Sequence, residues 1–343
     1  MSNPAVCIAS CRKEHFADWL SAWREEFQAN SVQVFAMCDA QHQDTIMPPE
    51  LPDWVHSWDH QDVKNLLQDK AWIIPTQTGA CKSFAILNAY LAGCDPILVL
   101  DDDCLPIAKN NSGWVAGHVI KLNGFVSPYV YNTSPGIRPR GTPYLPNVRV
   151  VLNHGLWEEN PDIDAITSLS PPPHAYIRYQ IDAPVPFGSL FPMCGMNIAF
   201  SREIAPLMYF GLQGPSWGVD RFDDIWCGFL VKKALDYVGL ACTSGSPVIR
   251  HVRASDPLKS IVKEAPGYAM NIKFYTWVMN HQIGTGINRF LAPWDRKDEA
   301  PQPQTARAVL EAMATDMYQW ANGGEYFRNY GKAILAWLDL FSR

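Results

Sequence analysis

Three consecutive carboxylates, Asp101, Asp102 and Asp103, follow a short apolar run and are the side chains of this sequence best suited to hold a metal ion. Like charges about 4 Å apart repel by roughly 4 kcal/mol at an effective dielectric constant near 20, so a divalent cation is the simplest compensation. Side chains alternate along an extended chain, which places Asp101 and Asp103 on one side and Asp102 on the other. We therefore expect Asp101 and Asp103 to bind Mn²⁺ or Mg²⁺, and the ion to hold a diphosphate. A solvated acidic loop is the alternative interpretation.

Further candidates for the same chemistry lie in the second half of the chain. Asp223 and Asp224 stand at the expected start of a helix, where carboxylates act either as caps or as groups that bind a sugar hydroxyl or take a proton. His251 follows a strand-like apolar run and is a candidate third metal ligand or phosphate contact, although a lone histidine is more often structural. Phosphates need cations, and any single cation is more often a surface residue. The candidate phosphate contacts are Lys82, Arg138, Arg140, Arg149 and Arg253.

The elements that must position these side chains begin with a strand, a helix and a strand. Residues 5–10 read as a buried strand, residues 15–27 carry apolar side chains on one helical face, and residues 32–37 read as a second strand. This order is typical of a parallel or mixed sheet with covering helices. Residues 97–100 form another apolar run that leads directly into the three carboxylates. Open α/β sheets bind ligands at the carboxyl ends of their strands, so the acidic cluster occupies a favoured position.

The rest of the chain predicts one large domain over residues 1–300 and a helical extension over residues 301–343. Residues 187–240 resemble a second half of the same α/β domain, ending in the helix that starts near Asp223. Beyond Pro301, two stretches with helical spacing flank Gly323 and Gly324, which predicts a helical hairpin. These aromatic-rich helices either mediate homo-oligomerisation or pack on their own domain.

Composition excludes several classes of protein. The formal net charge of −6 argues against a nucleic-acid partner, because such partners require a clustered basic surface. Nine scattered cysteines without a CxxC pair favour reduced thiols and a cytoplasmic protein. No secretory signal and no transmembrane segment is predicted, since the longest apolar stretch is broken by polar residues. The chain also lacks the P-loop, GxSxG and HExxH motifs.

Several segments together resemble the reversibly glycosylated polypeptides, also called UDP-arabinopyranose mutases. The similarity extends over most of residues 5–260, and the order of its motifs after LDDDC is specific. The matching segments are LDDDC (100–104), RGTPY (140–144), HGLW (154–157), PDIDA (161–165), LFPMCGMNIAF (190–200), MYFGL (208–212), RFDDIWCGF (221–229) and HVRASDP (251–257).

The resemblance implies a glycosyltransferase-A-like fold, a requirement for Mn²⁺ or Mg²⁺, and a metal-dependent enzyme that interconverts UDP-L-arabinopyranose and UDP-L-arabinofuranose. It also implies reversible attachment of the sugar to an arginine, which matches Arg140, with Asp223 or Asp224 assisting proton transfer. Asp101, Asp103 and His251 are then the expected metal ligands. The residues expected to contact the UDP-sugar are Arg12, Asp39, Lys82, Asp102, His154, Asn197 and Arg253.

Three segments depart from the family pattern and keep other functions open. A second family arginine falls at Asn147 here, with Arg149 as its candidate replacement. ASCR, which keeps Arg12, stands for a PTxR-like turn, and MCDA, whose acid is Asp39, stands for a QDGD-like segment. The alternatives are a glycosyltransferase or mutase for another nucleotide sugar, and a non-catalytic subunit that binds nucleotide sugars.

Overall fold

The structure is a computed structural model of the 343-residue chain. It describes residues 2–39, 47–48, 50–107, 113–127, 137, 140–142, 147–170, 182–252, 256–283 and 305–342. Arg138 and Arg253, two of the predicted phosphate contacts, lie outside these described residues.

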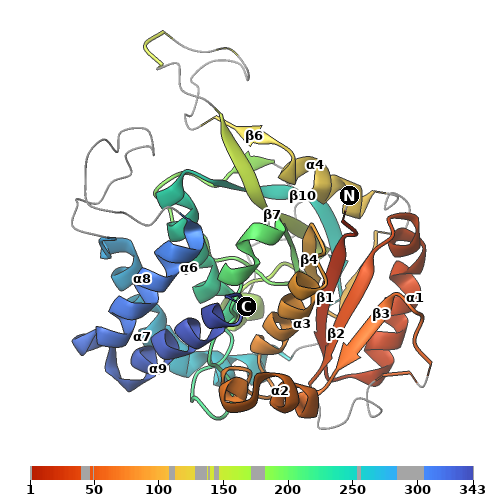
Figure 1. The fold of residues 1–343 in the computed structure, drawn as a ribbon, viewed down its shortest axis with the longest axis horizontal. Helices are drawn as coiled ribbons and strands as arrows, with labels where there is room; N and C mark the ends of the chain where they lie inside the picture. Colours follow the sequence, from red (N-terminus) through yellow and green to blue (C-terminus); the bar gives the residue numbers. More distant parts are fainter. Residues whose placement is uncertain are drawn as a thin grey trace.

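The amino-terminal strands form the parallel half of one mixed sheet (Figure 1). β1 (Ala5–Ser10) pairs in parallel with β2 (Gln33–Cys38) on one side and with β4 (Ile97–Leu100) on the other. β3 (Val55–Trp58) extends this half beyond β2. The predicted strand, helix and strand are confirmed, because α1 (Lys13–Ala29) connects β1 to β2. The four residues of β4 are all buried, as expected for a strand covered on both faces.

The second half of the sheet contains one reversed strand in its centre. β9 (Asn197–Phe200) lies antiparallel between β4 and β7 (Val148–Glu159). β10 (Ala241–His251) continues in parallel beside β7. The full order is β3-β2-β1-β4-β9-β7-β10-β5, in which β5 is Cys104–Leu105, while β6 (Phe125–Val126) pairs with β7 and β8 (Ala183–Pro184) pairs with β10. This path, with β9 reversed inside it, is a mixed sheet of the α/β class that the sequence predicted.

Helices cover both faces of the sheet, and alternate residues of β1 face the two layers. Val6 and Ile8 pack in the cluster that includes α1 and α4, whereas Ala5 and Cys7 pack in the cluster that includes α3 and α6. The remaining helical elements are α2 (His60–Leu67), η2 (Gln68–Ile73), α3 (Ala80–Leu91), α4 (Trp114–Leu122), α5 (Ala165–Leu169), η3 (Arg202–Leu207), α6 (Asp223–Val238), α7 (Pro257–Asn280), α8 (Ala306–Gln319), η5 (Ala321–Gly323) and α9 (Gly324–Asp339).

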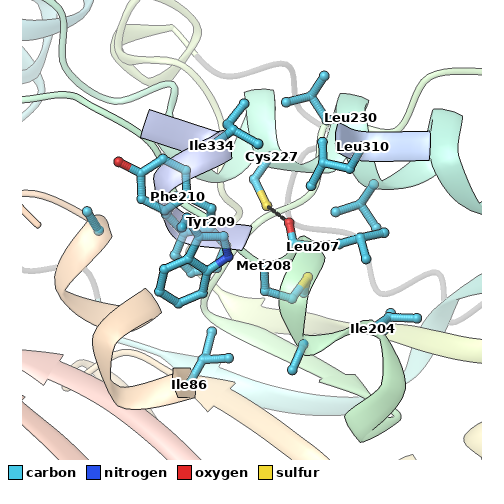
Figure 2. Packing of buried hydrophobic residues seen from close by; sticks show 14 of the residues in the cluster. Ile86, Ile204, Leu207, Met208, Tyr209, Phe210, Cys227, Leu230, Leu310 and Ile334 are labelled. Atoms are coloured by element: carbon cyan, nitrogen blue, oxygen red, sulfur yellow. Dashed lines mark hydrogen bonds between the residues drawn. The ribbon is translucent and has the colours of Figure 1, made fainter. Parts of the chain in front are cut away.

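The predicted C-terminal helices are confirmed as α8 and α9, and they share the core of the α/β part. Figure 1 shows α6, α7, α8 and α9 gathered on one side of the molecule. Figure 2 shows Leu310 of α8 and Ile334 of α9 beside Leu230 of α6, with the Cys227 thiol donating to the Leu207 carbonyl oxygen over 3.6 Å. The boundary near residue 300 stays a prediction. Within the described residues, none of the helices combines the length and the apolar character needed to cross a membrane.

Candidate active site

The acidic cluster lies where β4 leaves the sheet, beside the carboxyl end of β1. Asp102 is buried and turned toward β1, where it accepts a 2.5 Å hydrogen bond from the Ser10 hydroxyl and forms an ion pair with Arg12. Asp101 and Asp103 keep more of their side-chain surface open, 30% and 15%, against 3% for Asp102. The predicted alternation of the three side chains therefore holds for the described atoms. Asp102 is bound to Ser10 and Arg12, and the carboxylates of Asp101 and Asp103 are the more accessible ones.

Lys82 is the counter-charge of Asp101. It extends from the first turn of α3, forms an ion pair with Asp101, and donates a 3.2 Å hydrogen bond to the Gly195 carbonyl oxygen. Burial lowers the pKa of Lys82, but the nearby carboxylates of Asp101 and Asp224 more than offset this and hold the pKa above its ordinary value. Lys82 is therefore a permanent cation inside an acidic site.

Asp103 and His251 form the part of the site whose donors fit a hard divalent ion. The Nδ1 atom of His251 lies 2.8 Å from the Asn160 carbonyl oxygen, which can only accept, so Nδ1 must carry the proton. The other ring nitrogen, Nε2, faces the Asp103 carboxylate at 3.8 Å. A histidine that donates through one nitrogen and presents the other is the usual arrangement for a metal ligand. Burial raises the pKa of Asp103, and the charge of Asp101 raises it further, so a cation here would relieve the repulsion.

The carboxylate oxygens of Asp101 and Asp103 thus match the preferences of Mn²⁺ or Mg²⁺, and the His251 nitrogen favours Mn²⁺ of the two. Their ligand atoms are not all drawn together, however. In the described part of the chain, the group whose ligand atoms all lie within 4.8 Å of one another is a different one, Asp39, His60 and Cys81.

Asp223 and Asp224 occupy the first turn of α6, but neither is its N-cap residue, which is Phe222. Their carboxylates accept hydrogen bonds from other segments: Asp223 from the backbone N–H of Gly79, and Asp224 from that of Gly195, each over 2.8 Å. A Cβ atom at Gly79 would lie 2.2 Å from an oxygen of Asp223, so only glycine permits this approach. Each carboxylate also accepts from a backbone N–H in the first turn of α6, so the pair both satisfies that turn and links α6 to α3 and to the segment before β9.

Asp224 is a group of the site whose pKa is raised strongly. Burial raises its pKa to about 8, with further contributions from the charges of Asp223 and Asp162. Burial also raises the pKa of Asp223, while Lys82 opposes that shift. A carboxyl group with a pKa near neutrality exchanges protons readily under physiological conditions, which is the property of a general acid or base.

Asp162 and Ser10 belong to the site but were not singled out from the sequence. The charge of Asp162 acts on both Asp224 and Cys194, which places it beside the end of α6 that carries the carboxylates. Its segment, PDIDA, was part of the family resemblance, yet nothing in its spacing indicates the contact with residue 224. Ser10 was assigned only to a strand, and its role follows from the position of Asp102.

Two predicted sugar-nucleotide contacts are buried and already satisfied. Asn197 accepts from Trp114 and His118 and donates to the carbonyl oxygens of residues 156 and 247, which uses all the hydrogen bonds of the amide. The Nε2 atom of His154 accepts from the Cys194 backbone N–H over 3.3 Å, and burial lowers its pKa to about 4. Both side chains hold neighbouring segments of the site in place. A direct contact of Asn197 or of the His154 Nε2 atom with a ligand would have to break one of these hydrogen bonds.

The remaining predicted arginines, Arg140 and Arg149, form no ion pair with the acids of the site among the described residues. Arg149 is the second residue of β7, pairs with Glu203, and stands toward the end of the strand opposite to the acidic cluster. Arg140 is exposed and lies eight residues before the start of β7. Among the described residues, neither arginine forms an ion pair with Asp101, Asp103, Asp223 or Asp224. The structure therefore brings together Arg12, Lys82 and the acids, but not Arg140 or Arg149.

The fold and this site define an α/β protein with a mixed sheet and a carboxylate cluster at the carboxyl end of its central strand β4. Residues 3–338 match the family described as "Reversibly glycosylated polypeptide", and the chain belongs to that family. It is 35% identical over 265 residues to UDP-arabinopyranose mutase 1 of Arabidopsis thaliana, covering 73% of this chain and 72% of that protein. It is 34% identical to UDP-arabinopyranose mutase 2 of the same plant, covering 94% and 87%. A structural match is the glucosyl-3-phosphoglycerate synthase of Mycobacterium tuberculosis, with a TM-score of 0.43, 15% identity, and coverage of 84% and 85%.

Proposed function

We propose that this protein is a metal-dependent UDP-arabinopyranose mutase that interconverts UDP-L-arabinopyranose and UDP-L-arabinofuranose. The observation that carries the proposal is the arrangement of Asp101, Asp103 and His251 near the half-buried pair Asp223 and Asp224, with Lys82 between the two groups of acids. The chain is a member of a family whose similar proteins are named as such mutases. A bound Mn²⁺ or Mg²⁺ would stabilise charge on the departing diphosphate. Asp101, Asp103 and His251 are the residues that would hold it.

The positive groups around the acids have the task of binding UDP. Lys82 and Arg12 are both held by carboxylates of the cluster, and a diphosphate would compete for their N–H groups. Arg253, outside the described residues, stays a predicted phosphate contact. Asp39, at the end of β2, stays a predicted contact of the nucleoside.

The covalent step assigns Arg140 as the group that receives the sugar. The bond between the anomeric carbon and the UDP oxygen breaks, a bond from carbon to an Arg140 nitrogen forms, and UDP leaves with the bonding electrons. The sugar ring opens, closes again as a five-membered ring, and UDP reverses the first step. Because a guanidinium has no free lone pair, one proton must leave the nitrogen as the bond forms. Asp224, with its pKa of about 8, is the group that accepts this proton, assisted by Asp223.

The length of the chain permits Arg140 to reach the acids. Seven residues lie between Arg140 and Val148, and the eight steps from one to the other span at most about 27 Å when extended. Leu100 pairs with Asn197, which lies level with Gly155, about 23 Å along β7 from Val148. Arg149 is held within β7, where it pairs with Phe125, and we leave it out of the proposed mechanism.

The experiment that tests the function is an interconversion assay. The purified protein is incubated with each UDP-arabinose, with Mn²⁺ or with a chelator, and the nucleotide sugars are separated by chromatography. Interconversion that requires metal and is lost in Asp103→Asn supports the proposal. UDP binding without interconversion at any protein concentration would replace it with a binding subunit, and turnover of a different donor in a broad screen would replace the substrate.

The role of Arg140 has its own test. Arg140→Ala is expected to lose both the covalent sugar adduct, seen by mass spectrometry, and interconversion, while UDP binding persists. An unchanged rate in this variant would remove Arg140 from the mechanism. A cytoplasmic location completes the proposal, supported by nine cysteines that are all free thiols. Homo-oligomerisation stays a prediction that the molar mass in solution would test.

A further inference from the structure

A second group of metal-type donors lies in a neighbouring part of the fold, and the proposed mechanism leaves its histidine and cysteine unused. Its aspartate, Asp39, offers this group the Oδ1 atom, which leaves Oδ2 for the predicted contact with the nucleoside. Asp39 follows β2, His60 is the first residue of α2, and Cys81 is in the first turn of α3. The Nε2 atom of His60 lies 2.8 Å from an oxygen of Asp39 and 3.8 Å from the sulfur of Cys81. All three ligand atoms lie within 4.8 Å of one another, so three separate segments converge on one point.

These spacings are close to those within a tetrahedral zinc site. With Zn–O and Zn–N bonds of about 2.0–2.1 Å and a Zn–S bond of about 2.3 Å, tetrahedral geometry puts the oxygen about 3.3 Å and the sulfur about 3.6 Å from the nitrogen. The observed distances of 2.8 and 3.8 Å differ from these values by about half an ångström or less. Imidazole with a thiolate favours zinc over the hard ions Mg²⁺ and Mn²⁺. The two metal sites would thus select different ions.

The three donors are largely buried, but two of them keep a small solvent-exposed surface. The side chains of His60 and Asp39 are 8% and 11% exposed, and Cys81 is fully buried. Cys11, the exposed thiol that follows β1, lies near enough to feel the charge of Asp39 and to affect the Cys81 thiol. Its exposed thiol makes it a candidate for the fourth ligand.

We propose that Asp39, His60 and Cys81 form a binding site for Zn²⁺, with Cys11 or a water molecule as the fourth ligand, separate from the Mn²⁺ or Mg²⁺ site at Asp101 and Asp103. Binding requires the Cys81 thiol to lose its proton to solvent and the Nε2 atom of His60 to present its lone pair. Because burial raises the pKa of the Cys81 thiol, zinc must displace a firmly held proton.

The alternative is a structural role, in which these three residues only connect β2, α2 and α3. In that case the hydrogen bond from His60 to Asp39, together with the bond from the Gln77 N–H to the same Asp39 oxygen, would be the whole function. Metal binding distinguishes the two roles, since a structural link needs no thiolate.

The test uses Co²⁺ as a spectroscopic substitute for zinc on the full-length protein after chelator treatment. One equivalent of Co²⁺ is expected to produce a thiolate-to-cobalt charge-transfer band, which Zn²⁺ abolishes by displacement, with release of at least one proton per ion. Cys81→Ser should lose the band, and His60→Gln should weaken Zn²⁺ binding by more than about tenfold. Cys94→Ser, a buried cysteine after α3, is the matched control and should keep both properties.

Cys11→Ser then identifies the fourth ligand, since a weaker charge-transfer band in this variant assigns a second thiolate and an unchanged band assigns water. Thermal unfolding followed by circular dichroism establishes that each variant is folded. Absence of a thiolate band in the folded wild-type protein, or the same band in folded Cys81→Ser, would overturn the proposal.

Discussion

The ion pair between Lys82 and Asp101 offers the most informative perturbation of the site. In Lys82→Met the side chain keeps much of its apolar length and loses its charge, which leaves Asp101 beside Asp103 and the first turn of α6 without its counter-charge. Removing one partner of a buried ion pair costs about 3–5 kcal/mol. We expect about 3 kcal/mol here, the lower end, because the Asp101 side chain keeps 30% of its surface exposed.

The same variant should respond more strongly to Mn²⁺. An ion present at 100 times its Kd stabilises a protein by about 2.7 kcal/mol, and each tenfold gain in affinity adds about 1.4 kcal/mol. Because the cluster of Lys82→Met is more negative, its affinity for Mn²⁺ should rise and recover part of the lost stability. UDP binding should weaken at the same time, because a phosphate contact is lost.

Denaturant unfolding with chelator and with Mn²⁺ measures both effects, and Lys70→Met is the control. Lys70 pairs with Asp339, whose side chain is 60% exposed, so the control should lose less than about 1 kcal/mol. The reasoning is refuted if the two variants lose equal stability, or if Mn²⁺ adds the same increment to both.

Three further predictions concern the groups around α6. Asp224→Asn should abolish a rise in turnover with pH: the pKa of Asp224 is raised to about 8, so the base form grows as pH increases through about 8, and a pH–rate profile that keeps this rise in the variant would contradict the assignment. Gly79→Ala should cost about 1–3 kcal/mol in an unfolding assay, because its Cβ would lie 2.2 Å from Asp223, whereas Gly117→Ala, with a nearest contact of 3.3 Å, should cost less. His154 should stay neutral down to about pH 4 in an NMR titration, and since its folded pKa is lowered, its contribution to stability should be lost as pH falls from about 6.5 to about 4; titration near 6.5 in the folded protein would contradict its burial.

The strands and helices with strong periodicity were predictable from the sequence. β1, β2 and β4, the helices α1 and α6, and the C-terminal hairpin all lie where their apolar spacing indicated, within a few residues at each end. α7 was missed because Pro266 and Gly267 interrupt its helical pattern. The structure explains the glycine, since a Cβ at residue 267 would lie 2.1 Å from the Phe222 ring. That requirement is set by packing between distant segments, which spacing along the chain does not encode.

Residue types predicted the acidic site, but their partners were not predictable. The position of Asp101, Asp102 and Asp103 after a strand followed from local pattern, and the division of the three among Lys82, Arg12 and His251 followed only from the fold. Likewise, residue type alone predicted both Arg149 and Lys82 as phosphate contacts. Strand direction separates them, because Arg149 stands toward the amino end of β7 and the acids lie beyond the carboxyl end of β4.

Trp226 connects the C-terminal hairpin to the helix that carries Asp223 and Asp224. This indole, two residues beyond Asp224 on α6, contacts the rings of Phe327 and Tyr330 on α9 with centroid distances of 5.5 and 6.3 Å. The packing of the hairpin against α6 therefore helps to fix the orientation of the helix that carries Asp223 and Asp224. Substitutions in α9 that never approach a substrate would alter turnover by tilting that helix. Substitutions in α8 and α9 could thereby change the turnover rate without changing any residue of the site.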